Sequence, residues 1–154
     1  MKKLFILSLV TLLLLTIVST GWCQEQETRD LIVKNLNTFY GKIKTGDVEG
    51  MKKMLTAETA KKVKVADNPN VLGNIDAVLG IADSVKNGEI TVSIKNLKFH
   101  FKEVLQDKVV VITQFDMLLK KGDKEINNNG KNEVILLREG DKWLIMNLTD
   151  KIKE

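Results

Sequence analysis

The chain has 154 residues, with 24 Lys and Arg against 20 Asp and Glu, one His, one Cys and one Pro. This length predicts a single domain, because domains commonly contain about 100–200 residues. Apolar residues make up 44% and charged residues 29% of the chain, which is typical of a globular protein and not of a disordered one. The net charge is only +4 and the two signs are interspersed, so we expect no nucleic-acid partner.

The first 23 residues have the parts of an export signal. Lys2 and Lys3 form a positively charged start, and an apolar stretch over residues 4–18 follows. That stretch is shorter than the about 20 residues that a membrane-spanning helix needs. Removal of residues 1–23 lowers the net charge from +4 to +2, because Lys2 and Lys3 are lost with them. We therefore expect residues 1–23 to be a signal peptide and residues 24–154 to form an exported domain, periplasmic or secreted.

The end of the signal has alternative readings. Small residues allow cleavage after Gly21 or after Cys23. Cys23 could instead carry a lipid, as in bacterial lipoproteins, but the bulky Trp22 stands where such proteins have a small residue. Membrane association is expected only if Cys23 is lipidated. If Cys23 leaves with the signal, the mature chain contains no cysteine and forms no disulfide.

A long helix is predicted over residues 28–44. Its apolar residues recur at the helical spacing and form one stripe: Ile32, Leu36, Phe39 and Ile43. Thr28 is a suitable N-cap, and Gly46 is expected to end the helix.

Two further helices are predicted before the strands begin. Asp47 can cap a short helix that runs through Leu55. The composition of residues 66–70 predicts a loop. Asn74 is then placed to cap a third helix, over residues 75–86, with one apolar face.

From Gly88 onward the apolar period changes to two, which predicts strands. The first strand steps out of phase between Ile94 and Leu97, so we expect a bulge near Lys95-Asn96. The other strands are expected over residues 109–120, 131–139 and 142–148, with tight turns at Gly122-Asp123 and Gly140-Asp141. This order predicts an α+β domain whose N-terminal helices pack against a bent antiparallel meander of four or more strands.

Two stretches resemble the nuclear transport factor 2-like (SnoaL-like) superfamily. Residues 39–51 are similar to the family's aromatic end of the first helix, its Gly-Asp turn and the start of its second helix. Residues 139–145 are similar to its last hairpin, in which an acidic-Gly turn leads to a Trp. The resemblance covers residues 28–148. It implies a cone-like domain whose curved sheet wraps the first helix and can leave a pocket, often in a dimer.

The family includes ketosteroid isomerases, dehydratases and epoxide hydrolases beside members that only bind or assemble. The resemblance places the isomerase's oxyanion-binding tyrosine at Phe39, which has no hydroxyl to donate. It places the general-base aspartate at Val63 or a nearby Lys, and neither can accept a proton as a carboxylate does. Tyr40 follows Phe39 but points about 100° away around the helix. We therefore expect that this protein is not a ketosteroid isomerase.

Two polar residues, Gln114 and Asp116, interrupt an otherwise apolar strand. If the first hairpin turns at residues 106–107, they face Phe99 and Leu97 on the inner side of the sheet. Buried polar groups at such positions often mark a ligand pocket. A register slip of one residue would instead place both on the solvated face.

The predicted ligand-binding residues are Phe39, Tyr40, Gln114 and Asp116, and the expected ligand is a small apolar molecule. His100 pairs with Thr113 in the same register and meets no orienting carboxylate, so we interpret it as a half-exposed strand residue. The inventory contains no Gly-x-Ser-x-Gly turn and too few Cys and His for zinc. Residues 123–130 lack the final Glu of a calcium loop and are predicted to form a hairpin loop. We expect no cofactor and no metal, and we assign no residue a catalytic role.

Two functional hypotheses follow. The first is an exported, non-catalytic domain that binds a small ligand or assembles with a partner. The alternative is a small pocket enzyme of the isomerase, dehydratase or hydrolase type, in which Asp116 works with Tyr40 or His100.

The last two predicted strands are apolar on both faces. Helices on one side can cover only one of these faces. One face carries Val134, Leu136, Trp143 and Ile145, and the other carries Ile135, Leu137, Leu144 and Met146. Uncovered apolar faces usually mark an interface, and we expect Leu136 to lie on the uncovered face. We therefore expect a homodimer through the convex face of the sheet.

Overall fold

The computed structural model describes residues 2–66 and 72–151, with side chains from residue 24 onward. It forms two compact units, Met1–Val33 and Lys34–Glu154. The predicted signal peptide falls outside the residues with described side chains, and so does most of the predicted loop over residues 66–70. Among the residues that are described, no helix is long and apolar enough to span a membrane.

Helix α1 (Lys2–Thr45) carries the predicted apolar stripe, whose four side chains are fully buried. Thr28 is not an N-cap, because α1 runs through it without a break. The helix ends as predicted, since Gly46 adopts a φ of 68°, a conformation that favours glycine. A Cβ at Gly46 would also lie only 2.6 Å from the backbone nitrogen of Lys86, so the close approach requires glycine a second time.

The next two predicted helices begin at their predicted caps. Asp47 accepts a hydrogen bond from the Gly50 amide at 2.9 Å and starts α2 (Val48–Lys52), which is shorter than expected. Asn74 accepts one from the Ala77 amide at 2.8 Å and starts α4 (Ile75–Lys86). Of the three predicted N-caps, Asp47 and Asn74 therefore begin helices and Thr28 does not.

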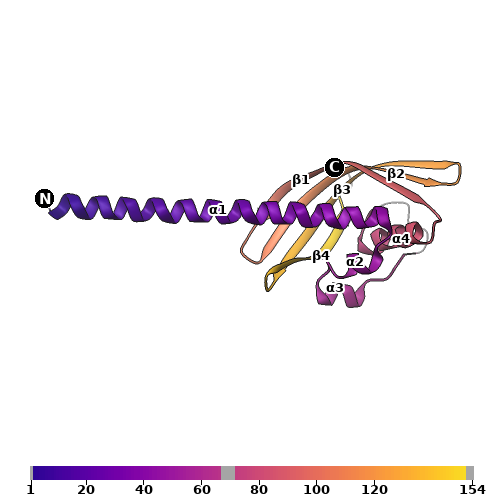
Figure 1. The fold of residues 1–154 in the computed structure, drawn as a ribbon, viewed down its shortest axis with the longest axis horizontal. Helices are drawn as coiled ribbons and strands as arrows, with labels where there is room; N and C mark the ends of the chain where they lie inside the picture. Colours follow the sequence, from indigo (N-terminus) through magenta and orange to yellow (C-terminus); the bar gives the residue numbers. More distant parts are fainter. Residues whose placement is uncertain (1, 67–71, 152–154) are drawn as a thin grey trace. The chain divides into compact units, whose positions relative to one another are not determined.

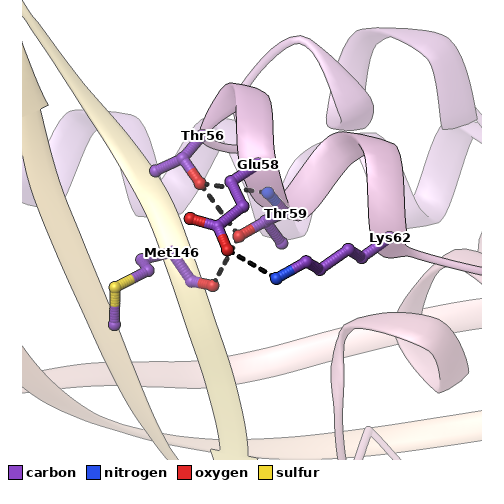
Figure 2. A network of polar contacts seen from close by, with 5 residues as sticks. All are labelled: Thr56, Glu58, Thr59, Lys62 and Met146. Atoms are coloured by element: carbon purple, nitrogen blue, oxygen red, sulfur yellow. Dashed lines mark hydrogen bonds and ion pairs between the residues drawn. The ribbon is translucent and has the colours of Figure 1, made fainter.

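One helix, α3 (Ala57–Lys62), was not predicted. It contains no buried side chain and hence has no apolar period to detect. Polar contacts hold it against the last strand instead (Figure 2). Thr56 accepts a hydrogen bond from the Thr59 amide at 3.3 Å, and the Thr59 hydroxyl donates to the Met146 carbonyl at 2.8 Å.

Four antiparallel strands form the sheet in the chain order β1-β2-β3-β4, so the predicted meander is confirmed (Figure 1). They are β1 (Thr91–Val104), β2 (Lys108–Lys121), β3 (Lys124–Glu139) and β4 (Lys142–Asp150). The Asn-rich run over residues 127–129 is not a loop as predicted. It pairs with β2, because the turn at Gly122-Asp123 is tight and pairing continues directly from it.

Two bulges interrupt the pairing of β1 with β2. Beside the turn, Val104 pairs with Val109 in the predicted register. A bulge between Phe101 and Glu103, which was not predicted, then shifts the pairing by one residue. The predicted bulge follows, between Lys95 and Lys98.

This shift changes which side chains of β2 face the core. Thr113 pairs with Phe99, and His100 pairs with Ile112 instead of Thr113. Thr113 is buried, whereas Gln114 is half-buried and Asp116 is exposed. The predicted inner placement of Gln114 and Asp116 is therefore wrong, and the alternative with a one-residue slip is correct.

The core lies between the inner face of the sheet and the helices. The inner positions of β2, β3 and β4 are buried: Val111, Thr113, Phe115, Met117, Leu119, Asn132, Val134, Leu136, Trp143 and Ile145. On α1, Asn35 donates a hydrogen bond to the Trp143 carbonyl at 3.0 Å. Near the sheet, α2 contacts α4, and both α3 and α4 contact β4 (Figure 1). The expected α+β architecture is confirmed.

Candidate functional site

A polar cluster lies inside the core, where α1 meets β2 and β3. The Tyr40 hydroxyl is 2.8 Å from the Thr113 hydroxyl, which donates to the Asn132 carbonyl at 3.4 Å. Since Thr113 has a single hydroxyl hydrogen, Tyr40 donates to Thr113. Burial raises the pKa of Tyr40 above its ordinary value of 10.0, so the phenol is neutral at physiological pH.

The side-chain amide of Asn132 is the unusual member of this cluster. It lies near Tyr40 and, after the Thr113 hydroxyl, lowers the pKa of Tyr40 against the effect of burial. Neither its nitrogen nor its oxygen has a hydrogen-bond partner among the described residues. Such a group costs about 1–3 kcal/mol when it is buried. Its inward position could have been predicted, because Asn132 has the same strand parity as Val134 and Leu136.

Phe39 and Tyr40, two of the predicted ligand-binding residues, lie in this core. Their rings pack edge to face with centroids 5.9 Å apart. Tyr40 also contacts the ring of Phe115, at 5.6 Å. Their rings therefore pack among the buried core side chains, where aromatic pairs contribute to stability.

Gln114 and Asp116, the other two predicted residues, line a hollow of about 790 Å³ on the opposite face of the sheet. We call it the outer hollow. Its side chains come from three strands and the end of the fourth: Asn96, Lys98, Gln114, Asp116, Asn129, Lys131, Asp150 and Lys151. Strand pairing places Lys98, Asn129 and Lys131 on the same face as Gln114 and Asp116.

The pairing of the strands arranges these side chains in two rows. Lys98, Gln114 and Lys131 pair in one row across β1, β2 and β3, and Asp116 pairs with Asn129 in the next. Since neighbouring strands lie about 4.8 Å apart, the two lysines are separated by about 10 Å with Gln114 between them. Across the described part of the chain, neither lysine has an ion pair.

The bulge between Lys95 and Lys98 shapes one wall of the outer hollow. Asn96 has a φ of 53°, which asparagine tolerates better than most residues. This conformation directs its side-chain amide to Asp116, with a hydrogen bond of 2.6 Å. Bulges commonly redirect side chains beside functional sites. The bulge was visible in the sequence, but its contact with Asp116 was not.

Phe115 and Gly130 pair across β2 and β3 and also line the hollow. A Cβ at Gly130 would lie 2.1 Å from the Phe115 ring, so the ring covers the glycine directly. An aromatic side chain over a strand glycine in this way restores packing that glycine lacks.

Glu133 marks the border of the outer hollow. It forms ion pairs with Lys102 at 3.2 Å and Lys151 at 3.5 Å. The hydrogen bond from Lys102 is the main reason that the pKa of Glu133 is lowered. Its carboxylate therefore remains ionised and already has two partners.

An apolar patch lies beyond Glu133 on the same face. Ile112, Ile135, Leu137 and Leu144 are half-buried there and Met146 is more exposed. Leu136, which was expected on the uncovered face, is instead fully buried on the inner face, so that residue assignment is wrong.

A second hollow, of about 510 Å³, lies between α3, the start of α4 and β4. Its charged residues are largely satisfied. Glu58 and Lys62 form an ion pair at 2.5 Å, which lowers the pKa of Glu58 (Figure 2). Asp76 accepts a hydrogen bond from the Lys64 amide at 3.0 Å. The outer hollow therefore has more charged side chains without an ion-pair partner in the described structure, among them those of Lys98 and Lys131.

The structure separates the residues of the suggested acid–base pairs. Tyr40 lies in the core and Asp116 on the outer face, so they share no cavity. His100 is on the outer face but pairs with Ile112, four residues from Asp116 on β2 and thus about 13 Å away along the strand. The described residues also contain no group of three or more His, Cys, Asp or Glu that could hold a metal ion.

Solved structures with a similar fold support this description. A candidate scytalone dehydratase from Novosphingobium aromaticivorans aligns with a TM-score of 0.57 at 10% identity, over 82% of this chain and 86% of that one. A candidate dehydratase of the nuclear transport factor 2-like family from Streptomyces avermitilis gives 0.55 at 14% identity, over 83% and 99%. A protein from Catenulispora acidiphila gives 0.53 at 12% identity, over 84% and 94%.

The chain has the nuclear transport factor 2-like fold. The resemblance expected from residues 39–51 and 139–145 is confirmed at the level of the fold. No protein-family sequence model matches the chain, and no curated protein matches it in sequence.

Proposed function

We propose that this chain is an exported, non-catalytic domain that binds a small polar ligand in the outer hollow. One observation carries the proposal: eight polar residues from all four strands and the segment after β4 line a hollow of about 790 Å³. A binding site needs concavity and a few convergent polar groups, and the hollow has both. The expectation of an apolar ligand depended on an inner position for Gln114 and Asp116 and loses its basis.

The separation of the titratable groups favours binding over catalysis. General acid–base chemistry needs a base within hydrogen-bond reach of the reacting proton, and usually a second group to complete the transfer. Tyr40 is neutral and enclosed, and Asp116 is occupied by Asn96. The dehydratase descriptions of two fold neighbours keep the enzyme alternative testable, with Asp116 as its essential residue.

The experiment is a screen of polar small molecules by amide chemical shifts, followed by calorimetry on the purified protein. We expect hits to perturb residues of the outer hollow. Asp116→Ala should weaken binding, whereas His100→Ala, another exposed side chain on the same face, should not. Turnover of a steroid, epoxide or ester that Asp116→Asn abolishes would overturn the proposal. So would hits that perturb only Tyr40, Thr113 and Asn132.

A second proposal concerns assembly. The apolar patch of Ile112, Ile135, Leu137 and Leu144 favours a homodimer through the outer face, because the helices cover the other face. At about 100 µM a dimer with micromolar affinity is mostly associated. Leu137→Glu should then give a monomer by sedimentation, whereas Lys121→Glu near the hairpin turn should not. A monomer at this concentration without any substitution would contradict the homodimer.

The export proposal has its own measurement. The mass of the mature protein should show the loss of residues 1–21 or 1–23. A diacylglycerol group on Cys23 would contradict soluble export and place the domain at a membrane surface.

A further inference from the structure

The free charges of the outer hollow indicate which ligands it suits. Its two central ammonium groups, on Lys98 and Lys131, have no carboxylate partner among the residues that the structure describes. The carboxylate beside them, Asp116, already accepts the Asn96 amide at 2.6 Å. The hollow therefore offers positive charge at its centre and a hydrogen-bonded carboxylate at its side.

The geometry allows both lysines to bind one group. Lys98 and Lys131 flank Gln114 across two strand spacings, about 10 Å in all. Each ammonium is on a flexible four-carbon stem that can lean over Gln114 from its own side. The Gln114 side chain supplies neutral N–H donors between them. Three donor groups can thus reach one ligand group above β2.

The surrounding carboxylates lie outside the row of Lys98, Gln114 and Lys131. Asp150 also lines the hollow, but it pairs with the inward-facing Asn132 at the end of β4. Glu133 lies two residues beyond Lys131 on β3 and forms ion pairs with Lys102 and Lys151. Asp116 and Asn129 form the adjacent row, where carboxylate and amide oxygens can accept hydrogen bonds from hydroxyl groups. A cation is disfavoured because both central lysines would repel it.

We propose that the outer hollow binds a small anion with a carboxylate or phosphate group next to several hydroxyl groups. The inference rests on the proposed function and specifies its ligand class. The anionic group lies over Gln114 between Lys98 and Lys131, because charge-assisted hydrogen bonds are the strongest available there. The hydroxyl groups lie toward Asp116 and Asn129.

The test compares glucuronate with glucose, a matched pair of sugars that differ in one carboxylate, and includes inorganic phosphate. Each is titrated into the ¹⁵N-labelled protein. We expect glucuronate and phosphate to shift the amides of Lys98, Gln114 and Lys131. Glucose should bind about tenfold more weakly than glucuronate, or worse. Added salt should weaken the binding of both anions, because it screens exposed charges.

Two variants separate local recognition from general charge. Gln114→Glu is nearly isosteric and places a carboxylate between the lysines, so it should abolish anion binding while the fold is retained by circular dichroism. Asn127→Asp adds the same charge on the same face, about 13 Å farther along the hairpin, and should leave binding within about twofold. If Gln114→Glu does not fold, Lys131→Gln with Lys124→Gln as its control replaces this pair.

The outcomes are distinct. Equal binding of glucose and glucuronate, or equal weakening by both charge variants, would overturn the anion inference and leave the binding function in place. If no small molecule perturbs the hollow, the proposed function fails as well. Binding to phosphatidylglycerol vesicles without binding to free glucuronate or phosphate would contradict a soluble ligand and indicate a lipid headgroup.

Discussion

Neighbouring residues of β2 point to two faces of the sheet that differ in burial and polarity. Thr113 and Phe115 face the core, where they contact Tyr40 and are almost fully buried. Gln114 and Asp116 alternate with them and line the outer hollow. The inner face consists of packed apolar side chains around one polar cluster, and the outer face combines free charge with an uncovered apolar patch. In this domain the inner face therefore supports stability, and the outer face is the candidate for recognition.

The largest difference between the two faces is expected at two adjacent leucines of β3. Leu136 is fully buried on the inner face and Leu137 is half-buried on the outer face. Leu136→Ala should lower the free energy of unfolding by about 2–5 kcal/mol, because it leaves a cavity. Leu137→Ala should cost about 1 kcal/mol or less in the monomer. Equal losses in urea unfolding of dilute protein would mean that the two faces are not distinct.

Glycine substitutions test how closely the inner face is packed. Gly130→Ala should lower the free energy of unfolding by about 1–3 kcal/mol, because its Cβ would lie 2.1 Å from the Phe115 ring. Gly41→Ala in α1 is the control. Its Cβ would have no neighbour within 4 Å, so it should stabilise the protein by about 0.5–1 kcal/mol. If Gly130→Ala is neutral in thermal unfolding, the ring does not cover the glycine.

The buried polar cluster gives a third contrast. Thr113→Val leaves the Tyr40 hydroxyl unpaired and should cost about 1–3 kcal/mol. Asn132→Leu removes an amide that has no partner in the described structure, so it should be neutral or stabilising. A loss with Asn132→Leu as large as with Thr113→Val would show that a water molecule or a ligand satisfies the amide.

The smallest expected effect is the alkaline titration of Tyr40, the only tyrosine of the chain. Burial raises its pKa above 10.0, so its contribution to stability is present below pH 10 and is lost as the pH rises through the folded-state pKa. Tyrosinate absorbance should therefore have a higher midpoint in the native protein than in denaturant. Tyr40→Phe should show a shallower loss of stability above pH 10. Equal midpoints in the two states would place Tyr40 in water.

Local signals in the sequence predicted most of the fold. The helical stripe that includes Phe39, the caps Asp47 and Asn74, and the glycine turns are short-range features, and the structure confirms them. Helix α3 was missed because it buries no side chain, and polar contacts hold it. Thr28 was misread because the helix continues on both sides of it.

The candidate site was only partly predictable for a different reason. Gln114 and Asp116 were identified from their chemistry, but their face depended on strand register. A bulge between Phe101 and Glu103 shifts this register, and the sequence there contains no glycine or proline from which the bulge could be predicted. Asn129 was missed because residues 123–130 were predicted to form a loop. Lys131 begins a predicted strand, but its position opposite Gln114 depends on the register. Register is a long-range property, and a one-residue slip moves every side chain to the other face.

The most direct measurement is a crystal structure of the protein purified from its native compartment or soaked with glucuronate, with attention to where ligand density lies. We expect density in the outer hollow, in contact with Lys98, Gln114 and Lys131, and at most a water molecule beside Asn132. Ligand density enclosed between Tyr40, Thr113 and Asn132, with an empty outer hollow, would contradict this expectation and make the inner face the binding face.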